Sequence, residues 1–273
     1  MNKKKPILTV ILVALCLILL GCAVRGTPIG DYSYAESARY QSGSTSVSGQ
    51  VKALDVSWVD GRVTIAYHDG DEVVLSETSA RKLTEKTELH WLLEGGTLHI
   101  RYAESGLRLS TNLNKELIVL LPEGMALTDV KLSAVSAKVE VEALSADELR
   151  LETVSGNAQL NIASAKKLTT DSVSGRVNVT AGRLEEVNAN AISGDLHLEF
   201  ARTPEKISAD SVSGDVVIRL PGSAGFTADI DTVSGRVSGS MPMEKQGKTR
   251  YVCGNGSCDI RVDTVSGSVQ LDK

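Results

Sequence analysis

Seven serines recur in one local setting and are the most obvious candidates for nucleophilic chemistry. Each follows a Val or Ile and precedes a small residue; they are Ser136, Ser155, Ser174, Ser193, Ser213, Ser234 and Ser266. Catalysis needs one serine beside a base, and the four histidines, at positions 68, 90, 99 and 197, do not recur with the serines. Equivalent hydroxyls at equivalent turns instead predict a ladder that hydrogen-bonds the backbone. No catalytic residue is assigned.

A column of acidic or amide residues lies two positions before most of these Val and Ile residues. Its members are Glu152, Asp171, Asn190, Asp210, Asp231 and Asp263. Stacked carboxylates could bind calcium, and a pair of them such as Asp210 and Asp231 could hydrolyse a polysaccharide. The Gly-rich nonapeptides of calcium-binding repeats are absent, so solvated acids on an exposed face are the favoured interpretation. His90 and His99 could share one face of a hairpin about Gly95-Gly96, but two histidines are too few to assign a metal site.

A second charged column lies three positions after the Val or Ile. In chain order it places Arg176 next to Asp195 and Asp215 next to Arg236. If successive repeats stack, these residues become neighbours of opposite charge. Such exposed pairs add little stability but help to set the register between neighbouring strands.

Two cysteines near the C-terminus flank a turn. Cys253 and Cys258 enclose Asn255-Gly256, a strong tight-turn pair, so we expect them to face each other across a hairpin. In an exported protein this makes Cys253 and Cys258 a candidate disulfide.

The N-terminus has the features of an export signal. Lys3 to Lys5 precede an apolar run from Ile7 to Leu20, and the Leu-Leu-Gly-Cys that ends at Cys22 resembles a bacterial lipobox. We therefore expect residues 1–21 to be a signal peptide, Cys22 to be acylated, and residues 22–48 to form a tether. A multiply acylated Cys22 would anchor the protein to the cell membrane on its extracytoplasmic side.

The composition of the chain limits the classes of partner and cofactor that it is expected to bind. Without residues 1–21 the chain has 26 basic and 34 acidic residues, a net charge of −8. A basic patch with interleaved aromatic residues is missing, which argues against nucleic acid. Because the sequence also lacks a Gly-rich phosphate loop and the common zinc and nucleophile motifs, no cofactor is expected.

The spacing of the serines indicates the elements that position them. The Val or Ile of each triplet is Val135, Val154, Val173, Ile192, Val212, Val233 or Val265, in steps of 19, 19, 19, 20, 21 and 32 residues. Apolar residues alternate on both sides of each triplet, and their parity changes within it, so the triplet must be a corner between two strands. The Ser-Gly corners are Ser155-Gly156, Ser174-Gly175, Ser193-Gly194, Ser213-Gly214, Ser234-Gly235 and Ser266-Gly267, with glycine expected to supply a permissive backbone.

This period predicts an all-β fold, a single-chain β-solenoid or β-helix-like stack of rungs of about 19–21 residues, right-handed by the rule for parallel crossovers. Residues 135–273 are the regular repeats, with a hairpin insertion at about 239–258. Residues 51–134 hold fainter copies, such as the corner Val59-Asp60-Gly61, and are expected to extend the same stack irregularly. A separate N-terminal fold is the rival interpretation.

The repeated (Asp/Glu)-(Thr/Ser)-Val-Ser-Gly unit, with Val at the fourth and sixth positions after the first Val, resembles a bacterial domain family of unknown function. Its members are called putative adhesins. The segments Leu54 to Trp58 and Val63 to Ile65 also resemble the usual start of that family. The resemblance implies a β-helix-like stack on the cell envelope, relatives tied to envelope stress, and no catalytic residues to carry over. Ser136-Ala137 and the cysteine hairpin depart from its pattern.

Together these features predict a non-enzymatic cell-envelope lipoprotein whose β-repeat domain binds an envelope or extracellular partner, either a protein or a polymer. One alternative is a sensor or decoy in envelope stress that binds cationic peptides through acidic faces. The other is a polysaccharide-active β-helix enzyme.

Overall fold

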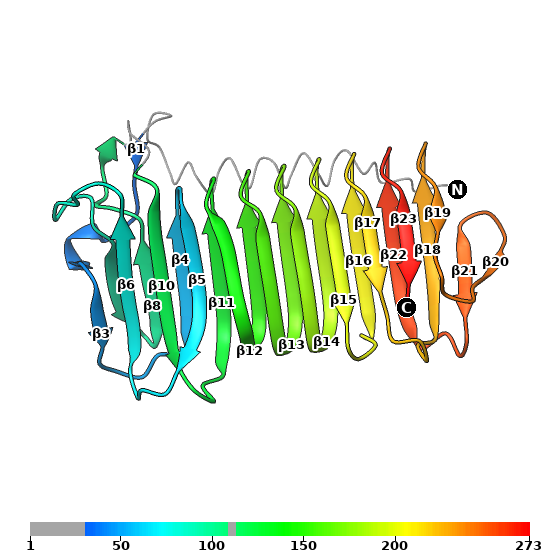
Figure 1. Cartoon of the computed structure of the whole chain (residues 1–273), viewed down its shortest axis with the longest axis horizontal. Coiled ribbons are helices and arrows are strands. Elements are labelled where there is room, and N and C mark those ends of the chain that lie inside the picture. The colour runs from blue at the N-terminus through cyan, green and yellow to red at the C-terminus, as the bar shows by residue number, and fades with distance from the viewer. Residues whose placement is uncertain (1–30, 109–112) are drawn as a thin grey trace.

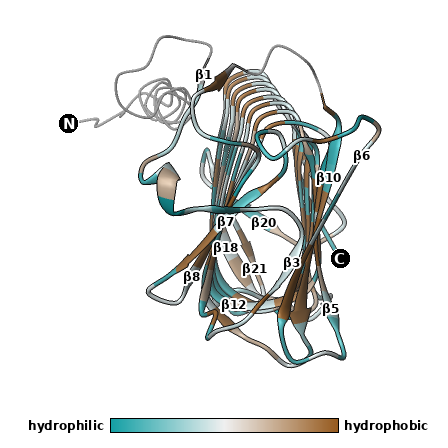
Figure 2. Ribbon diagram, turned by 90° about the vertical axis from the view of Figure 1, so that its left-hand side faces the viewer, coloured by the Kyte–Doolittle hydropathy of each residue, from teal (hydrophilic) through white to brown (hydrophobic). Residues whose placement is uncertain are grey.

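The protein is built from two long β-sheets that face each other. The computed structural model describes residues 31–108 and 113–273, and its one helix in these ranges is a short 3₁₀ turn, Ser37–Arg39. The sheets extend along the long axis of the molecule (Figure 1) and face each other when viewed along it (Figure 2); apolar side chains of both sheets form one buried core. The predicted all-β, solenoid-like stack is therefore confirmed. The predicted signal peptide and Cys22 lie outside the described residues.

Each rung contributes one strand to each sheet, and the predicted corners join the two strands. The first sheet contains the strands before the corners, in spatial order β2 (Gln41–Ser42), β7 (His90–Glu94), β8 (Thr97–Arg101), β4 (Ala53–Trp58), β11 (Leu127–Ala134), the second parts of β12 (Lys138–Thr153), β13 (Ala158–Ser172) and β14 (Val177–Ala191), β16 (Lys206–Ser211), β22 (Cys258–Thr264), β18 (Phe226–Thr232), β21 (Arg250–Cys253) and β20 (Glu244–Gln246).

The second sheet contains the strands after the corners. In spatial order they are β3 (Thr45–Val47), β6 (Val73–Ser79), β10 (Lys115–Pro122), β5 (Arg62–His68), the first parts of β12, β13 and β14, β15 (Leu196–Phe200), β17 (Val216–Arg219), β23 (Val269–Asp272) and β19 (Val237–Ser238). A separate two-stranded sheet pairs β1 (Asp31–Tyr32) with β9 (Leu107–Arg108).

Alternation of apolar and polar residues fills the interior between the sheets. Leu151 and Leu160, for example, are fully buried on either side of the corner at Val154. Where β12 passes from the second sheet into the first, the register shifts between Val141 and Leu144, and Ala143 adopts a positive φ of 50°. This bulge restores the inward parity that the corner had changed.

The corner serines connect one rung to the next. Each Ser N–H donates to the carbonyl of the corner Val or Ile of the preceding rung in space, at 2.8–3.0 Å. Six of the seven hydroxyls donate to the same carbonyls at 3.1–3.3 Å, all except that of Ser213. The hydroxyl column is thus part of the backbone ladder of the stack.

The corner glycines are required by close packing of neighbouring rungs. A Cβ on Gly175 would lie 2.0 Å from the carbonyl oxygen of Gly156, and one on Gly194 would lie 2.1 Å from that of Gly175. None of the six Ser-Gly glycines has a positive φ. The expected reason, a permissive backbone, is therefore wrong: backbone from the next rung occupies the place of a side chain.

The N-terminal strands continue the ladder. β4 pairs in parallel with β11, and the Ser136 N–H reaches the carbonyl of Val59 at 2.8 Å. The corner Val59-Asp60-Gly61 is therefore directly adjacent to the first regular corner. β8 and β10 form one further rung beyond it, and β7 and β8 form the antiparallel hairpin expected about Gly95-Gly96.

From β11 onward the rungs follow chain order only as far as β16 and β17. The last rung of the chain, β22 and β23, lies between β16–β17 and β18–β19 (Figure 1). The expectation that Asp215 and Arg236 are neighbours is therefore wrong. The Asp215 carboxylate instead accepts a hydrogen bond from the Ser268 N–H, at 2.8 Å. The expected Arg176–Asp195 pair is present at 3.0 Å. Because the repeats share one corner and one parity, the sequence pattern alone cannot decide which of them are adjacent.

The cysteines do not face each other. Within the insertion, β20 and β21 form an antiparallel pair that covers the outer edge of β18. Cys253 lies opposite Phe226 on one side of β18, and Cys258 lies opposite the same residue on the other side. Both cysteines are free and buried. The expected face-to-face arrangement is wrong because β18 lies between the strands that carry them.

Close packing at the corners gives a direct test. Gly194→Ala places a methyl group against the backbone of the neighbouring rung, and we expect it to lower the free energy of unfolding by about 2 kcal/mol or more. Gly222→Ala is the matched control, because its Cβ would meet only the Lys273 side chain, at 4.0 Å. Chemical denaturation measures both; equal stability of the two variants would contradict the close approach.

Candidate interaction surface

The outer face of the second sheet carries two polar columns. One column lies five residues after each corner Val or Ile and contains Gln159, Asn178, His197 and Val217. The other lies seven residues after it and contains Asn161, Thr180, Glu199 and Arg219. Residues of one column are direct cross-strand partners on β13, β14, β15 and β17. Each column therefore presents one side chain per rung, at intervals of about 4.8 Å.

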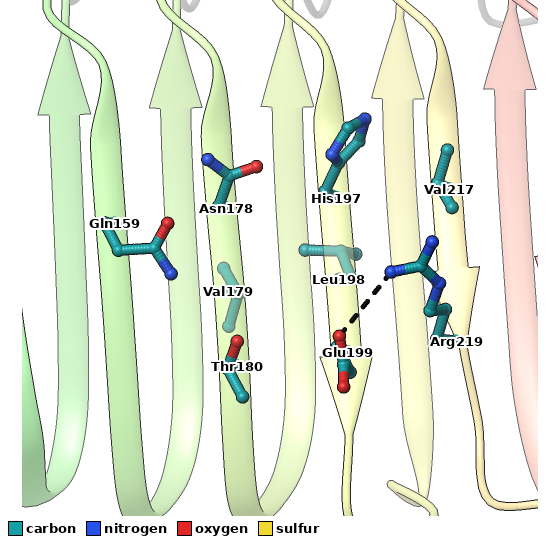
Figure 3. Close-up of a pocket in the computed structure, with 9 residues that line it drawn as sticks. All are labelled: Gln159, Asn178, Val179, Thr180, His197, Leu198, Glu199, Val217 and Arg219. Carbon is teal, nitrogen blue, oxygen red and sulfur yellow. Dashed lines mark ion pairs between the residues drawn. The ribbon is translucent and has the colours of Figure 1, made fainter.

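An open hollow of about 220 Å³, the polar hollow, lies over these columns. Figure 3 shows the side chains that line the polar hollow, which come from the neighbouring strands β13, β14, β15 and β17. The lining residues are Gln159, Asn178, Val179, Thr180, His197, Leu198, Glu199, Val217 and Arg219.

Most polar groups of the polar hollow are available to a ligand. The side chains of Gln159, Asn178 and Thr180 make no hydrogen bond to any other described residue. Glu199 and Arg219 form an ion pair at 3.7 Å, and both side chains are 56% exposed. Amide, hydroxyl and imidazole groups in this arrangement can donate and accept hydrogen bonds without a net charge.

An ion pair borders the polar hollow on the corner side. Arg176 bonds the Asp195 carboxylate, which also accepts the Asp215 N–H at 3.2 Å. Partial burial alone would raise the pKa of Asp195. The bonds from Arg176 and Asp215 and the charges of Arg176 and His197 outweigh it, and the pKa is lowered. Asp195 is therefore ionised at neutral pH and fixes the backbone of the next rung.

Comparison with known proteins identifies the family. The model of the Toastrack DUF4097 domain, a domain of unknown function, matches residues 51–272. The chain belongs to the Toastrack family. No curated protein matches it.

The chain is also similar to solved structures that are named as adhesion proteins. A putative adhesin from Bacteroides fragilis is 10% identical with a TM-score of 0.41, over 84% of this chain and 96% of that one. A putative cell adhesion protein from Clostridium sporogenes is 15% identical with a TM-score of 0.33, over 85% and 99%. At such low sequence identity, no binding residue of these proteins can be transferred to this chain.

The acidic column of the Toastrack domain lies on the other sheet, away from the polar hollow. In this column the Asp171 carboxylate accepts a bond from the Asn190 amide at 2.9 Å. Asp210, Asp263 and Asp231 lie on three adjacent strands, with Asp263 in the middle. Asp210 and Asp231 are therefore about 10 Å apart along the sheet, and neither belongs to the residues that line the polar hollow.

The expected histidine pair is also engaged elsewhere. His90 is buried and its Nδ1 bonds the Glu88 carbonyl, whereas the Nδ1 of His99 lies 2.9 Å from the Asp55 carboxylate. Within residues 31–108 and 113–273, no three His, Cys, Asp or Glu side chains are grouped so that they could hold a metal ion.

No helix in the same ranges has the length and apolar character needed to span a bilayer.

A buried ion pair near the N-terminal end was not foreseen from the sequence. The Lys115 ammonium lies 2.5 Å from the Glu77 carboxylate, with side chains 0% and 2% exposed, and 4.2 Å from the centre of the Tyr102 ring. Burial lowers the pKa of Lys115 and raises that of Glu77. The sequence does indicate an inward orientation for Lys115, because it lies two residues before the buried Leu117 in an alternating strand. The pair occupies the interior of the end rungs, between β6 and β10.

Asp210 gives a prediction about pH. Burial, and then the charge of Asp263, raise the pKa of Asp210, and its Oδ1 is buried without a hydrogen-bond partner in the described structure. A raised pKa means that ionisation costs stability, which is lost as the pH rises through the folded-state pKa. Asp210→Asn should therefore raise the thermal midpoint at pH 7 by about 1–3 °C and leave it unchanged at pH 3.

The matched control for this prediction is Asp231→Asn, at an exposed position of the same column. We expect it to change the midpoint little at either pH, as measured by calorimetry. A lower midpoint for Asp210→Asn at pH 7 would contradict the assignment.

Proposed function

We propose that this Toastrack protein is a non-enzymatic lipoprotein of the cell envelope that binds an envelope or extracellular partner through the polar hollow. The observation that carries the proposal is the set of unbonded polar side chains, Gln159, Asn178 and Thr180, on consecutive rungs of one exposed face. An exposed face that repeats the same position on each rung suits many weak contacts with an extended partner, either a protein or a polymer. The filled interior supports surface binding over an internal ligand.

The location rests on the N-terminal sequence. The lipobox-like Leu-Leu-Gly-Cys supports an acyl group on Cys22. The expected tether of residues 22–48 is wrong in its C-terminal part, because β2 and β3 pair with β7 and β6 and Val47 is buried. The net charge of −8 would keep the domain from adhering to anionic lipid, so the acyl chains would supply the attachment.

One observation favours the cationic-peptide alternative. Asp210, Asp263 and Asp231 bring three carboxylates together on the first sheet, and only Asp263 has a close cationic partner, Arg261 at 2.8 Å. In this alternative the protein binds cationic peptides in envelope stress, through the first sheet instead of the second.

Binding to isolated envelope material separates these proposals. We expect Asn178→Ala with His197→Ala to weaken binding of the full chain to purified cell-wall polymer and envelope protein fractions at least tenfold, because it removes two side chains from the polar hollow. The matched control is Thr169→Ala with Ser208→Ala, on the outer face of the first sheet in the same region. Equal binding by both variants would refute the polar hollow as the site. Binding of an oligolysine peptide that falls as salt rises and needs Asp210 would favour the alternative.

The anchor has its own test. Cys22→Ala removes the only atom that can accept the acyl chain at the lipobox, so we expect the protein to lose incorporated labelled palmitate. Fractionation of cells should show the loss as a shift out of the acylated membrane pool. Unchanged label in the variant would contradict lipidation at Cys22, without affecting the test of the polar hollow.

A further inference from the structure

The two cysteines lie in one row with an aromatic side chain between them. β18 pairs with β21 on one side and with β22 on the other, and Phe226 is the partner of Cys253 in the first pairing and of Cys258 in the second. Partners in a ladder point to the same face, and all three side chains are buried, with exposed fractions of 4%, 0% and 0% for Cys253, Phe226 and Cys258.

This row is too wide for a disulfide. Two strand spacings separate Cys253 from Cys258, so their Cα atoms are about 10 Å apart, whereas disulfides need Cα atoms about 4.4–6.8 Å apart. The connecting turn, residues 254–257, passes over the end of β18, where the Cys258 N–H bonds the Gly225 carbonyl at 3.1 Å. In sequence, however, only four residues separate the cysteines, and an unfolded chain brings such thiols together readily.

We propose that Cys253 and Cys258 are a redox modification site whose disulfide excludes the start of β18 from the stack. The disulfide would join β21 directly to β22, and Phe226 could not remain between them. The reduced, closed end and the oxidised end are therefore mutually exclusive states of the C-terminal rungs. Oxidation would release Phe226 from the core and free the backbone groups with which it pairs.

The chemistry requires an external disulfide. One cysteine thiolate attacks the donor disulfide and forms a mixed disulfide, releasing the first donor thiol. The second cysteine thiolate then attacks the protein sulfur and releases the second donor thiol. Two electrons pass to the donor, and the two cysteine protons go to the departing thiolates. Any disulfide of a thiol oxidoreductase or of a small thiol can serve.

Burial controls when this reaction occurs. The Cys253 thiol lies 3.5 Å from the Ala224 carbonyl, beneath the turn, and Cys258 is fully enclosed. Burial, and then the charge of Asp259, raise the pKa of Cys258 to about 12, which keeps its thiol protonated and unreactive. The closed end is therefore protected from oxidants, and the site reacts when the end rungs open or before they close.

Oxidative refolding tests the site. The experiment uses the full chain with Cys16→Ala and Cys22→Ala, so that Cys253 and Cys258 are the only thiols. In the native, reduced protein we expect both thiols to react with iodoacetamide at least a hundredfold more slowly than in the denatured chain. After refolding with glutathione disulfide, we expect peptide mapping to show a Cys253–Cys258 disulfide. Amide exchange at residues 226–228 should then be at least tenfold faster, and exchange in β13 unchanged.

The control carries Cys253→Ala and Cys258→Ala in addition, and the same treatment should leave its exchange at residues 226–228 unchanged. Three results would overturn the proposal: a Cys253–Cys258 disulfide with unchanged protection at 226–228, native thiols that react as fast as those of the denatured chain, or failure of the disulfide to form during refolding.

Discussion

The structure depends on the contact between the backbones of successive corners. A serine N–H, reinforced by its hydroxyl, bonds the carbonyl of the rung before it, and the glycine that follows leaves no room for a methyl group. This contact holds both sheets in one register, because each corner belongs to a strand on either side. Inward parity, the bulge at Ala143 and the charge columns outside all follow from that register. Stability is therefore distributed along the stack, as nearest-neighbour terms between rungs.

The same contact determines where function can lie. Val, Leu, Ile and Ala side chains fill most of the interior between the described rungs, so a ligand would meet this part of the chain on the outer faces or at the two ends. On those faces a residue recurs at the same place in every rung. A site such as the polar hollow is thus assembled from Gln159, Asn178 and His197, which are about 20 residues apart in sequence but adjacent in space. A buried ion pair, Lys115 with Glu77, closes one end of the core, and the β20–β21 hairpin covers an edge at the other.

Much of this could be predicted from the sequence, because the period and the parity change are local properties. The all-β stack, the Gly95-Gly96 hairpin and the Arg176–Asp195 pair required only the assumption that neighbouring repeats stack. What could not be predicted depends on which repeats are neighbours. By pattern alone, the rung at Val265 fits beside Val212 or Val233 equally well. The predicted neighbours of Arg236 and of the two cysteines were therefore wrong. The polar hollow could not be predicted either, because its shape depends on side chains from four strands at once.

The displaced last rung has a consequence for the order of events in the life of the chain. Synthesis proceeds from the N-terminus, so β16 and β18 exist before the segment that must lie between them. Until residues 258–272 emerge, that position has no occupant, and the two flanking strands have no shared partner. A polypeptide that ends before residue 258 therefore lacks the rung that joins β16 to β18, and the stack is completed only after residues 258–272 have been translated.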